Sequence, residues 1–292
     1  MQVTTDALRA FGGVIRKEFQ NGFAGVEPEW NKFASMVNST TSRETYAWLD
    51  DFPAMREWIG DRHRKELKER AYQVRNRDFE ATIRVDRNKF MDNELGTYST
   101  VANSLGMSAA ENPDILCFET LLKGNSNECY DGQNFFDTEH PVGKGLVSNY
   151  QDGGGNPWFL LCTTRPLKPI IYQQRKKADL VARLDPTSDN VFDRREYEWG
   201  ADSREAAGYG FWQMAFMSKA TLTPENYEAA RAAVSSFKSD EDRPLGLVPN
   251  LLVCGPSLEG RARDILLKER TTGGEDNKWK GTADLLMSGR IA

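Results

Sequence analysis

The chain has 292 residues, of which 39% are hydrophobic and 11% aromatic, so it can bury a sizeable core, and its length allows about two domains. Its net charge of −5 argues against nucleic-acid binding by phosphate neutralisation, which needs clustered Lys and Arg. The four cysteines lack paired spacing, as expected for reduced thiols, and the sequence shows neither a signal peptide nor an apolar run long enough for a membrane. We therefore predict a soluble protein that is made in the cytoplasm.

The N-terminal region predicts two helices. The first is capped by Thr5 or Asp6, and its apolar residues then recur every three or four positions until Asn21-Gly22, which would end it. The second is shorter and covers residues 29–37, with its large apolar residues on one side.

Residues 62–90 are heavily charged and predict a two-armed β ribbon. The second arm alternates apolar and polar residues from Phe79 to Val85, and this period of two is typical of a half-buried strand. The first arm, Lys65–Val74, is polar, and residues 75–78 would separate the two arms. Because an isolated two-stranded ribbon is marginal in water, we expect a neighbouring copy of the chain to receive it.

Charge is spread unevenly between this ribbon and the rest of the chain. Residues 56–90 hold eleven Lys and Arg against seven Asp and Glu, which leaves −9 for the remainder. A basic ribbon and an acidic body would favour docking between like subunits and set its register; the alternative is a solvated charged hairpin. The predicted inter-subunit residues are Arg62, Lys65, Lys68, Arg70, Arg75, Arg77, Phe79 and Ile83.

The rest of the chain predicts a long helix followed by a mixture of strands and helices. The long helix covers Glu94–Lys123, and Pro113 should kink or break it near Asn112. A loop rich in Gly, Asn and Asp follows at 124–157. Strands are predicted at Trp158–Cys162, Ile170–Gln174, Tyr209–Met217, Leu251–Cys254 and Ala283–Met287, and helices at 224–237 and 256–269.

Few residues could carry chemistry, since only two histidines occur. Asp137, Glu139 and His140 lie close together in sequence and could bind zinc or manganese, but no HxH, HExxH or CxxC accompanies them. We therefore favour a loop ordered by Asx-type turns over a metal site. The aromatic residues of 197–212 could stack on sugars or bases, although their strand spacing favours a place in the core. We predict no catalytic residues, no cofactor and no metal.

Taken in order, several segments resemble the major head subunit of Mu-like phages and prophages. No single motif is decisive, but together they run through nearly the whole chain in one order. They are Tyr46-Ala47-Trp48-Leu49, Met55-Arg56-Glu57-Trp58-Ile59-Gly60-Asp61-Arg62, Asn76-Arg77-Asp78-Phe79-Glu80-Ala81-Thr82-Ile83, Phe135-Phe136-Asp137-Thr138-Glu139-His140-Pro141, Arg165-Pro166-Leu167-Lys168-Pro169, Gly208-Tyr209-Gly210-Phe211-Trp212-Gln213, Pro249–Pro256 and Trp279-Lys280-Gly281-Thr282.

The resemblance implies an α+β chain with the Hong Kong 97-type phage capsid fold. Its parts would be an N-terminal arm (1–54), an extended β-hairpin loop (55–92), a peripheral domain with the long spine helix and the loop 124–157 (93–217), and an axial domain (218–292). It further implies a subunit without enzymatic activity that assembles into hexamers and pentamers of an icosahedral head. A separate scaffolding protein and a portal would take part in assembly in the host cytoplasm, and the virion would enclose double-stranded DNA without sequence-specific contact.

Two other functions stay open at this point. One is a metal-dependent or carbohydrate-active enzyme built around Asp137, Glu139 and His140. The other is a different virion protein, such as a tail or tube subunit, which would form rings or cylinders instead of closed shells.

Overall fold

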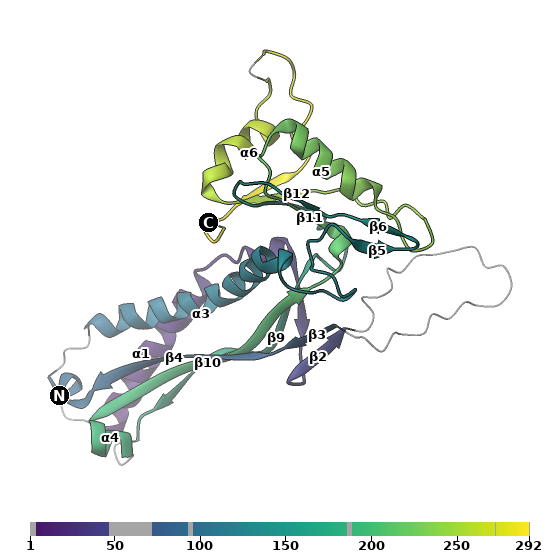
Figure 1. Ribbon diagram of the computed structural model, residues 1–292. Coiled ribbons are helices and arrows are strands. Elements are labelled where there is room, and N and C mark those ends of the chain that lie inside the picture. Colours follow the sequence, from purple (N-terminus) through teal and green to yellow (C-terminus); the bar gives the residue numbers. More distant parts are fainter. Residues whose placement is uncertain (1–3, 47–71, 93–95, 186–188, 272, 292) are drawn as a thin grey trace.

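The computed structural model describes residues 4–46, 72–92, 96–185, 189–271 and 273–291. These residues form two units (Figure 1). An elongated unit combines a four-stranded sheet with two long helices, and a second unit combines a five-stranded sheet with two shorter helices. The mixed helix and strand content agrees with the predicted α+β class.

The four-stranded sheet is the scaffold of the elongated unit, and its strand order is β1-β9-β10-β4. The long strands β9 (Ile170–Arg183) and β10 (Glu196–Tyr209) pair antiparallel, β4 (Arg77–Asp86) adds to β10 antiparallel, and β1 (Ala34–Asn38) adds to β9 in parallel. The alternation predicted from Phe79 to Val85 is a real strand with a half-buried face, since Ile83 and Val85 are buried.

The predicted pairing of the ribbon is wrong. β4 pairs with β10 over ten residues, from Glu196 opposite Asp86 to Glu205 opposite Arg77. The strand before it, β3 (Tyr72–Arg75), pairs instead with β2 (Arg43–Tyr46). The apolar face of β4 therefore finds its cover within its own subunit, and burial in a four-stranded sheet outweighs a local two-stranded pairing. Residues 65–71 of the predicted first arm lie outside the described residues.

Two helices cover one face of this sheet: α1 (Thr5–Ala24) and α3 (Gly96–Leu122) (Figure 1). Thr4 caps α1 by accepting a hydrogen bond from the backbone N–H of Ala7 at 3.2 Å. The helices touch through glycines, because a Cβ atom on Gly22 would lie 2.0 Å from the carbonyl oxygen of Asn103, and one on Gly106 equally close to that of Phe19.

Two predictions for these helices need correction. Gly22 lies inside α1 as a packing position, so Asn21-Gly22 does not end the helix. The long helix is confirmed, but it does not break at Pro113. Proline removes one backbone hydrogen bond there, and the burial of residues such as Leu116 and Phe118 in the second half of the helix outweighs this loss. Residues 29–37 are not a helix either: a 3-10 turn, Trp30–Lys32, precedes β1, since pairing with β9 overrides the local spacing.

The second unit has the strand order β13-β12-β8-β11-β7. Its central strands β8 (Trp158–Leu161), β11 (Ala215–Ser218) and β12 (Leu251–Cys254) are buried at every position. Its edges are β7 (Tyr150–Gln151) and β13 (Asp284–Met287), and α5 (Pro224–Ser236) and α6 (Glu259–Leu266) pack on it (Figure 1). The predicted elements β8, β12, β13 and α5 are confirmed, and the predicted helix at 256–269 is a 3-10 turn (Pro256–Leu258) followed by the shorter α6.

The remaining elements are short. The predicted strand Tyr209–Met217 divides into the end of β10, a 3-10 turn at Trp212–Met214 and β11. The aromatic side chains of this region, from Tyr197 to Trp212, are buried, which confirms the core reading. Loop 124–157 carries its own hairpin and β7. The short elements are α2 (Arg87–Met91), a 3-10 turn at Lys123–Asn125, β5 (His140–Val142), β6 (Gly145–Val147) and α4 (Asp189–Arg194).

Candidate inter-subunit surface and a buried histidine cluster

The two-stranded stem β2–β3 is attached to the body through one end of β10 (Figure 1). Tyr46 and Val74 are buried at this junction, and the hydroxyl of Tyr72 accepts a hydrogen bond from the N–H of Tyr209 at 3.0 Å. Gly208 allows the close approach, because a Cβ atom there would lie 2.4 Å from a methyl carbon of Val74. The stem is thus attached to the body at a fixed place, and the residues between Tyr46 and Tyr72 join its two strands.

The eight predicted contact residues separate into three groups. Arg62, Lys65, Lys68 and Arg70 lie outside the described residues. Arg75 and Arg77 are exposed where β3 and β4 meet, and Phe79 is half-buried, with the Arg77 guanidinium 5.2 Å from its ring centre. Ile83 is only 6% exposed and packs in the core of its own subunit beneath α1 and α3, so it drops out of the contact surface.

A cavity of about 180 Å³ lies between the stem, α3 and β10. Arg77 stands 4.0 Å from the carboxylate of Glu119 beside it, so the rim carries both signs of charge. A polar segment with a charged side chain would fit this rim better than an apolar one. The lining residues are Tyr72, Gln73, Val74, Arg75, Arg77, Leu116, Glu119, Thr120, Ala206 and Ala207.

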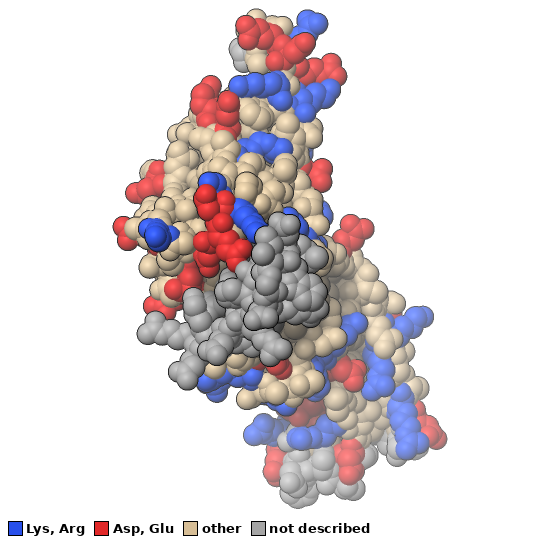
Figure 2. All heavy atoms as spheres, turned by 90° about the vertical axis from the view of Figure 1, so that its right-hand side faces the viewer, with Lys and Arg blue, Asp and Glu red and all other residues tan. Residues whose placement is uncertain are grey.

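The sheet face opposite the helices is covered by ion pairs between neighbouring strands. Arg84 lies close to Glu196 and Glu198, Arg183 to Glu198, Lys176 to Asp202, and Arg204 to Asp78. Exposed pairs of this kind contribute little stability each, but charges on an edge strand such as β4 discourage edge-to-edge aggregation. Figure 2 shows Lys and Arg interspersed with Asp and Glu over one face of the molecule, which is not the pattern of a phosphate-binding surface.

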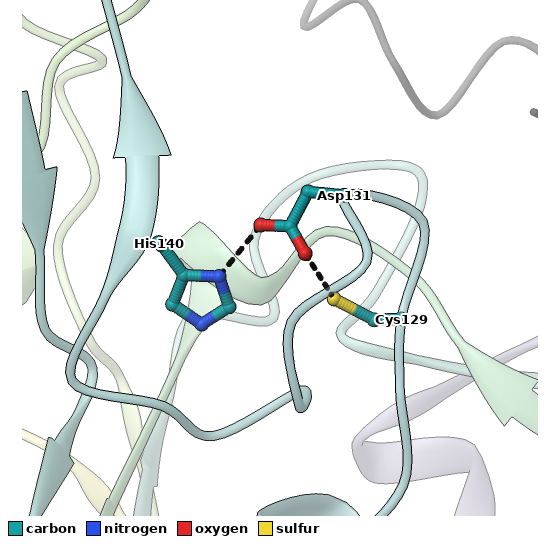
Figure 3. Close-up of side chains that lie close together, drawn as sticks. All are labelled: Cys129, Asp131 and His140. Carbon is teal, nitrogen blue, oxygen red and sulfur yellow. Dashed lines mark hydrogen bonds and ion pairs between the residues drawn. The ribbon is translucent and has the colours of Figure 1, made fainter. Parts of the chain in front are cut away.

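His140 lies at the centre of a buried polar cluster in loop 124–157 (Figure 3). Its Nδ1 is 2.6 Å from the carboxylate of Asp131, which also accepts a hydrogen bond from the thiol of Cys129 at 3.1 Å. Its Nε2 is 3.1 Å from Oδ1 of Asn149, and its ring stacks on Trp212 with the ring centres 3.9 Å apart. Burial pushes the pKa of Asp131 up, but the hydrogen bond and charge of His140 outweigh this and lower it.

The candidate metal ligands Asp137 and Glu139 do not join His140 in a group of ligand atoms in the described part of the chain. Oδ1 of Asp137 accepts hydrogen bonds from the backbone N–H groups of Thr138 and Glu139, at 2.7 and 3.1 Å, which is the expected Asx-type turn. Potential ligand atoms of Cys129, Asp131 and His140 do lie within 4.8 Å of one another.

These three groups already satisfy one another, and burial raises the pKa of the Cys129 thiol, which disfavours the thiolate that a metal requires. The cluster is therefore a buried hydrogen-bond network that orders the loop.

All four cysteines are free and buried. None of the helices in the described part of the chain is long and apolar enough to cross a membrane.

Comparison with known proteins agrees with this arrangement over the whole chain. The family model for the Mu-like prophage major head subunit gpT matches residues 8–291. The major capsid protein of Escherichia phage Mu is 39% identical over 302 residues, which cover 99% of each chain. The major head subunit of the Mu-like prophage FluMu of Haemophilus influenzae is 38% identical, with 91% of each chain covered.

Solved phage capsids show the same fold. A chain of the procapsid of bacteriophage JBD30 superposes with a TM-score of 0.87 at 37% identity, covering 99% of this chain and 100% of that one. A chain of the JBD30 capsid gives a TM-score of 0.82 at 29% identity, with 94% and 95% covered. These relatives are head proteins with the Hong Kong 97-type fold, and they support neither a tail protein nor an enzyme. The chain belongs to the family of Mu-like prophage major head subunits and is a major capsid protein of a tailed phage.

Proposed function

We propose that this chain self-assembles into hexamers and pentamers, which close an icosahedral head around double-stranded DNA. The observation that carries the proposal is the match to the JBD30 procapsid chain over the full length of both chains. The shared fold supports the proposal, because the surfaces through which the relative builds its shell are formed by that fold.

Within this shell, the parts of the chain take different roles. Residues up to β2 form the N-terminal arm, and the second unit, including residues 218–292, forms the axial domain at the centre of each capsomer. Because β4 pairs within the sheet, we propose residues 43–75 as the extended loop in place of 55–92; this segment comprises β2, β3 and the residues that join them. The other strands of that sheet and α3 form the peripheral domain, with α3 as its spine helix, and the N-terminal arm adds α1 and β1 to it.

The extended loop reaches an adjacent subunit. Residues 47–71 connect the two strands of the stem. At roughly 3.3 Å per residue, half of this segment is long enough to reach up to about 40 Å from the stem. Arg62, Lys65, Lys68 and Arg70 lie in this segment, and Arg75 and Arg77 lie at its base. Residues 43–75 hold eight Lys and Arg against seven Asp and Glu, so individual charged pairs rather than a net surplus of charge would guide docking on the adjacent subunit.

Assembly takes place in the host cytoplasm with a separate scaffolding protein and a portal, and the subunit has no catalytic role. The net charge of −5 suits a wall that encloses DNA without holding it, because clustered Lys and Arg would bind phosphate tightly.

A deletion tests the role of the extended loop. Removing residues 48–70 and joining the stem by a short turn should leave a folded subunit that forms no shells in electron micrographs. A matched variant replaces the same residues by a Gly/Ser linker of equal length and should fail in the same way, since side chains rather than chain length make the contact. Shells of normal size from either variant would contradict the proposal.

A further inference from the structure

Five polar side chains link the root of the β2–β3 stem to the peripheral sheet. The hydroxyl of Tyr46 on β2 donates to Oε1 of Gln173 on β9 at 2.8 Å. Nε2 of Gln173 donates to Oδ1 of Asn76, between β3 and β4, also at 2.8 Å. Nδ2 of Asn76 then donates to the hydroxyl of Ser39 at 2.8 Å, and Ser39 donates to Glu44 at 2.8 Å. The relay thus begins and ends on β2.

Both amides in this relay use all their polar atoms. Nε2 of Gln173 also reaches the carbonyl of Val74 at 3.3 Å, and Nδ2 of Asn76 reaches that of Thr41 at 2.9 Å. Gln173 is fully buried and Asn76 only 6% exposed. A buried network whose members are all satisfied is rigid, because turning any one group leaves donors or acceptors unpaired.

Glu44 closes the relay on the connection between β1 and β2. Its carboxylate accepts hydrogen bonds from the N–H groups of Thr40 and Thr41, at 2.9 and 3.1 Å, in addition to the hydroxyl of Ser39. These hydrogen bonds lower the pKa of Glu44 to about 2. The turn at which the chain leaves the sheet is therefore held by an ionised group at neutral pH.

Apolar packing and one further hydrogen bond hold the stem close to the body at the same junction. Val74 lies against the backbone of Gly208, and the hydroxyl of Tyr72 accepts a hydrogen bond from the N–H of Tyr209. Hydrogen bonds are directional, and those of the relay connect β2, β9 and the turns at Ser39 and Asn76, so a swing of the stem breaks several at once.

We propose that Asn76, Gln173 and Tyr46 are positioning residues for assembly: their relay sets the angle at which the stem leaves the sheet, and thereby the curvature and diameter of the shell. The inference rests on the proposed function, in which the loop that the stem carries contacts a neighbouring subunit. An angle held by the relay in each subunit limits how far the contacts between neighbouring subunits can differ in geometry.

The test compares two buried asparagines of one chain. Asn76→Ala breaks the relay, whereas Asn149→Ala removes an amide that bonds the carbonyl groups of Phe135 and Ala215 and takes no part in the relay. Both variants should lower the melting temperature of the subunit. Only Asn76→Ala should scatter the particle diameters measured by cryo-electron microscopy, with about a tenfold loss in the fraction of normal shells. Equal scatter from both variants, or uniform normal shells from both, would overturn the inference.

Tyr46→Phe provides a milder variant in case Asn76→Ala does not fold. It removes a single hydroxyl and keeps the ring in place, so the subunit should fold and its shells should again vary in diameter; uniform normal shells would count against the relay. The loop deletion separates this inference from the proposed function. Loss of shells on deletion, together with normal shells from Tyr46→Phe and Asn76→Ala, refutes the relay alone, whereas normal shells on deletion refute the function of the loop.

Discussion

The close contact between α1 and α3 makes Gly106→Ala a severe substitution. The new Cβ atom would lie 2.0 Å from the carbonyl oxygen of Phe19 and 2.8 Å from the backbone nitrogen of Phe23, whereas ordinary contact is 3.4–4 Å. Because both obstacles are backbone atoms, no side chain can rotate away, and the helices must move apart by more than 1 Å or so. Overpacking of this kind costs about 1–3 kcal/mol, and separating the helices also loosens the packing of buried residues such as Ile15.

Gly13→Ala is the matched control, because it lies in α1 with nothing within 4 Å of the new Cβ atom. There alanine should stabilise the helix by up to about 1 kcal/mol. Urea unfolding followed by circular dichroism, at a subunit concentration too low for assembly, measures both free energies. We expect Gly106→Ala to be about 2 kcal/mol or more less stable than Gly13→Ala. Equal stabilities for the two variants would refute the proposed backbone contact.

Four further predictions concern stability. Asp131→Ala should lower the free energy of unfolding in urea by about 3 kcal/mol, because it leaves buried His140 without its partner. Since the pKa of Asp131 is lowered, this difference from the parent should shrink as the pH falls. The melting-temperature difference between Glu44→Gln and the parent should be constant above pH 4.5 and fade as the pH falls towards about 2, and a difference unchanged by acid would contradict it. Asp114→Ala should cost about 2 kcal/mol of unfolding free energy, since two backbone N–H groups lose their acceptor; a neutral effect would show that water replaces it. EDTA should leave the melting temperature unchanged, and a fall would reveal a bound metal ion.

Local signals in the sequence identify many of the elements. Helix α5 is predicted because Thr223 and Pro224 mark its start, and β8 because an unbroken apolar run is typical of a strand in the middle of a sheet. The long helix α3 is found for the same kind of reason, through its apolar spacing. In each case the residues that decide the structure lie within one element.

Pairing between distant strands is what the sequence does not reveal. The alternation in β4 correctly predicts a strand, but its partner β10 lies more than a hundred residues further on, so the nearer Lys65–Val74 is chosen wrongly. The relay is hidden for the same reason, since Asn76 and Gln173 are 97 residues apart. In the histidine cluster, the sequence analysis misses Asp131, the partner of His140, and names Asp137 instead. Asp137 is closer to His140 in sequence, but its carboxylate binds the backbone N–H of Thr138.

The central claim is that identical subunits build a closed shell in which residues 43–75 of each subunit contact an adjacent subunit. A cryo-electron microscopy map of particles assembled from the purified chain and its scaffolding protein measures this directly. We expect icosahedral shells of hexamers and pentamers in which the segment from β2 to β3 lies against the adjacent subunit. Rings or cylinders, or a shell in which this segment contacts only its own subunit, would contradict the claim.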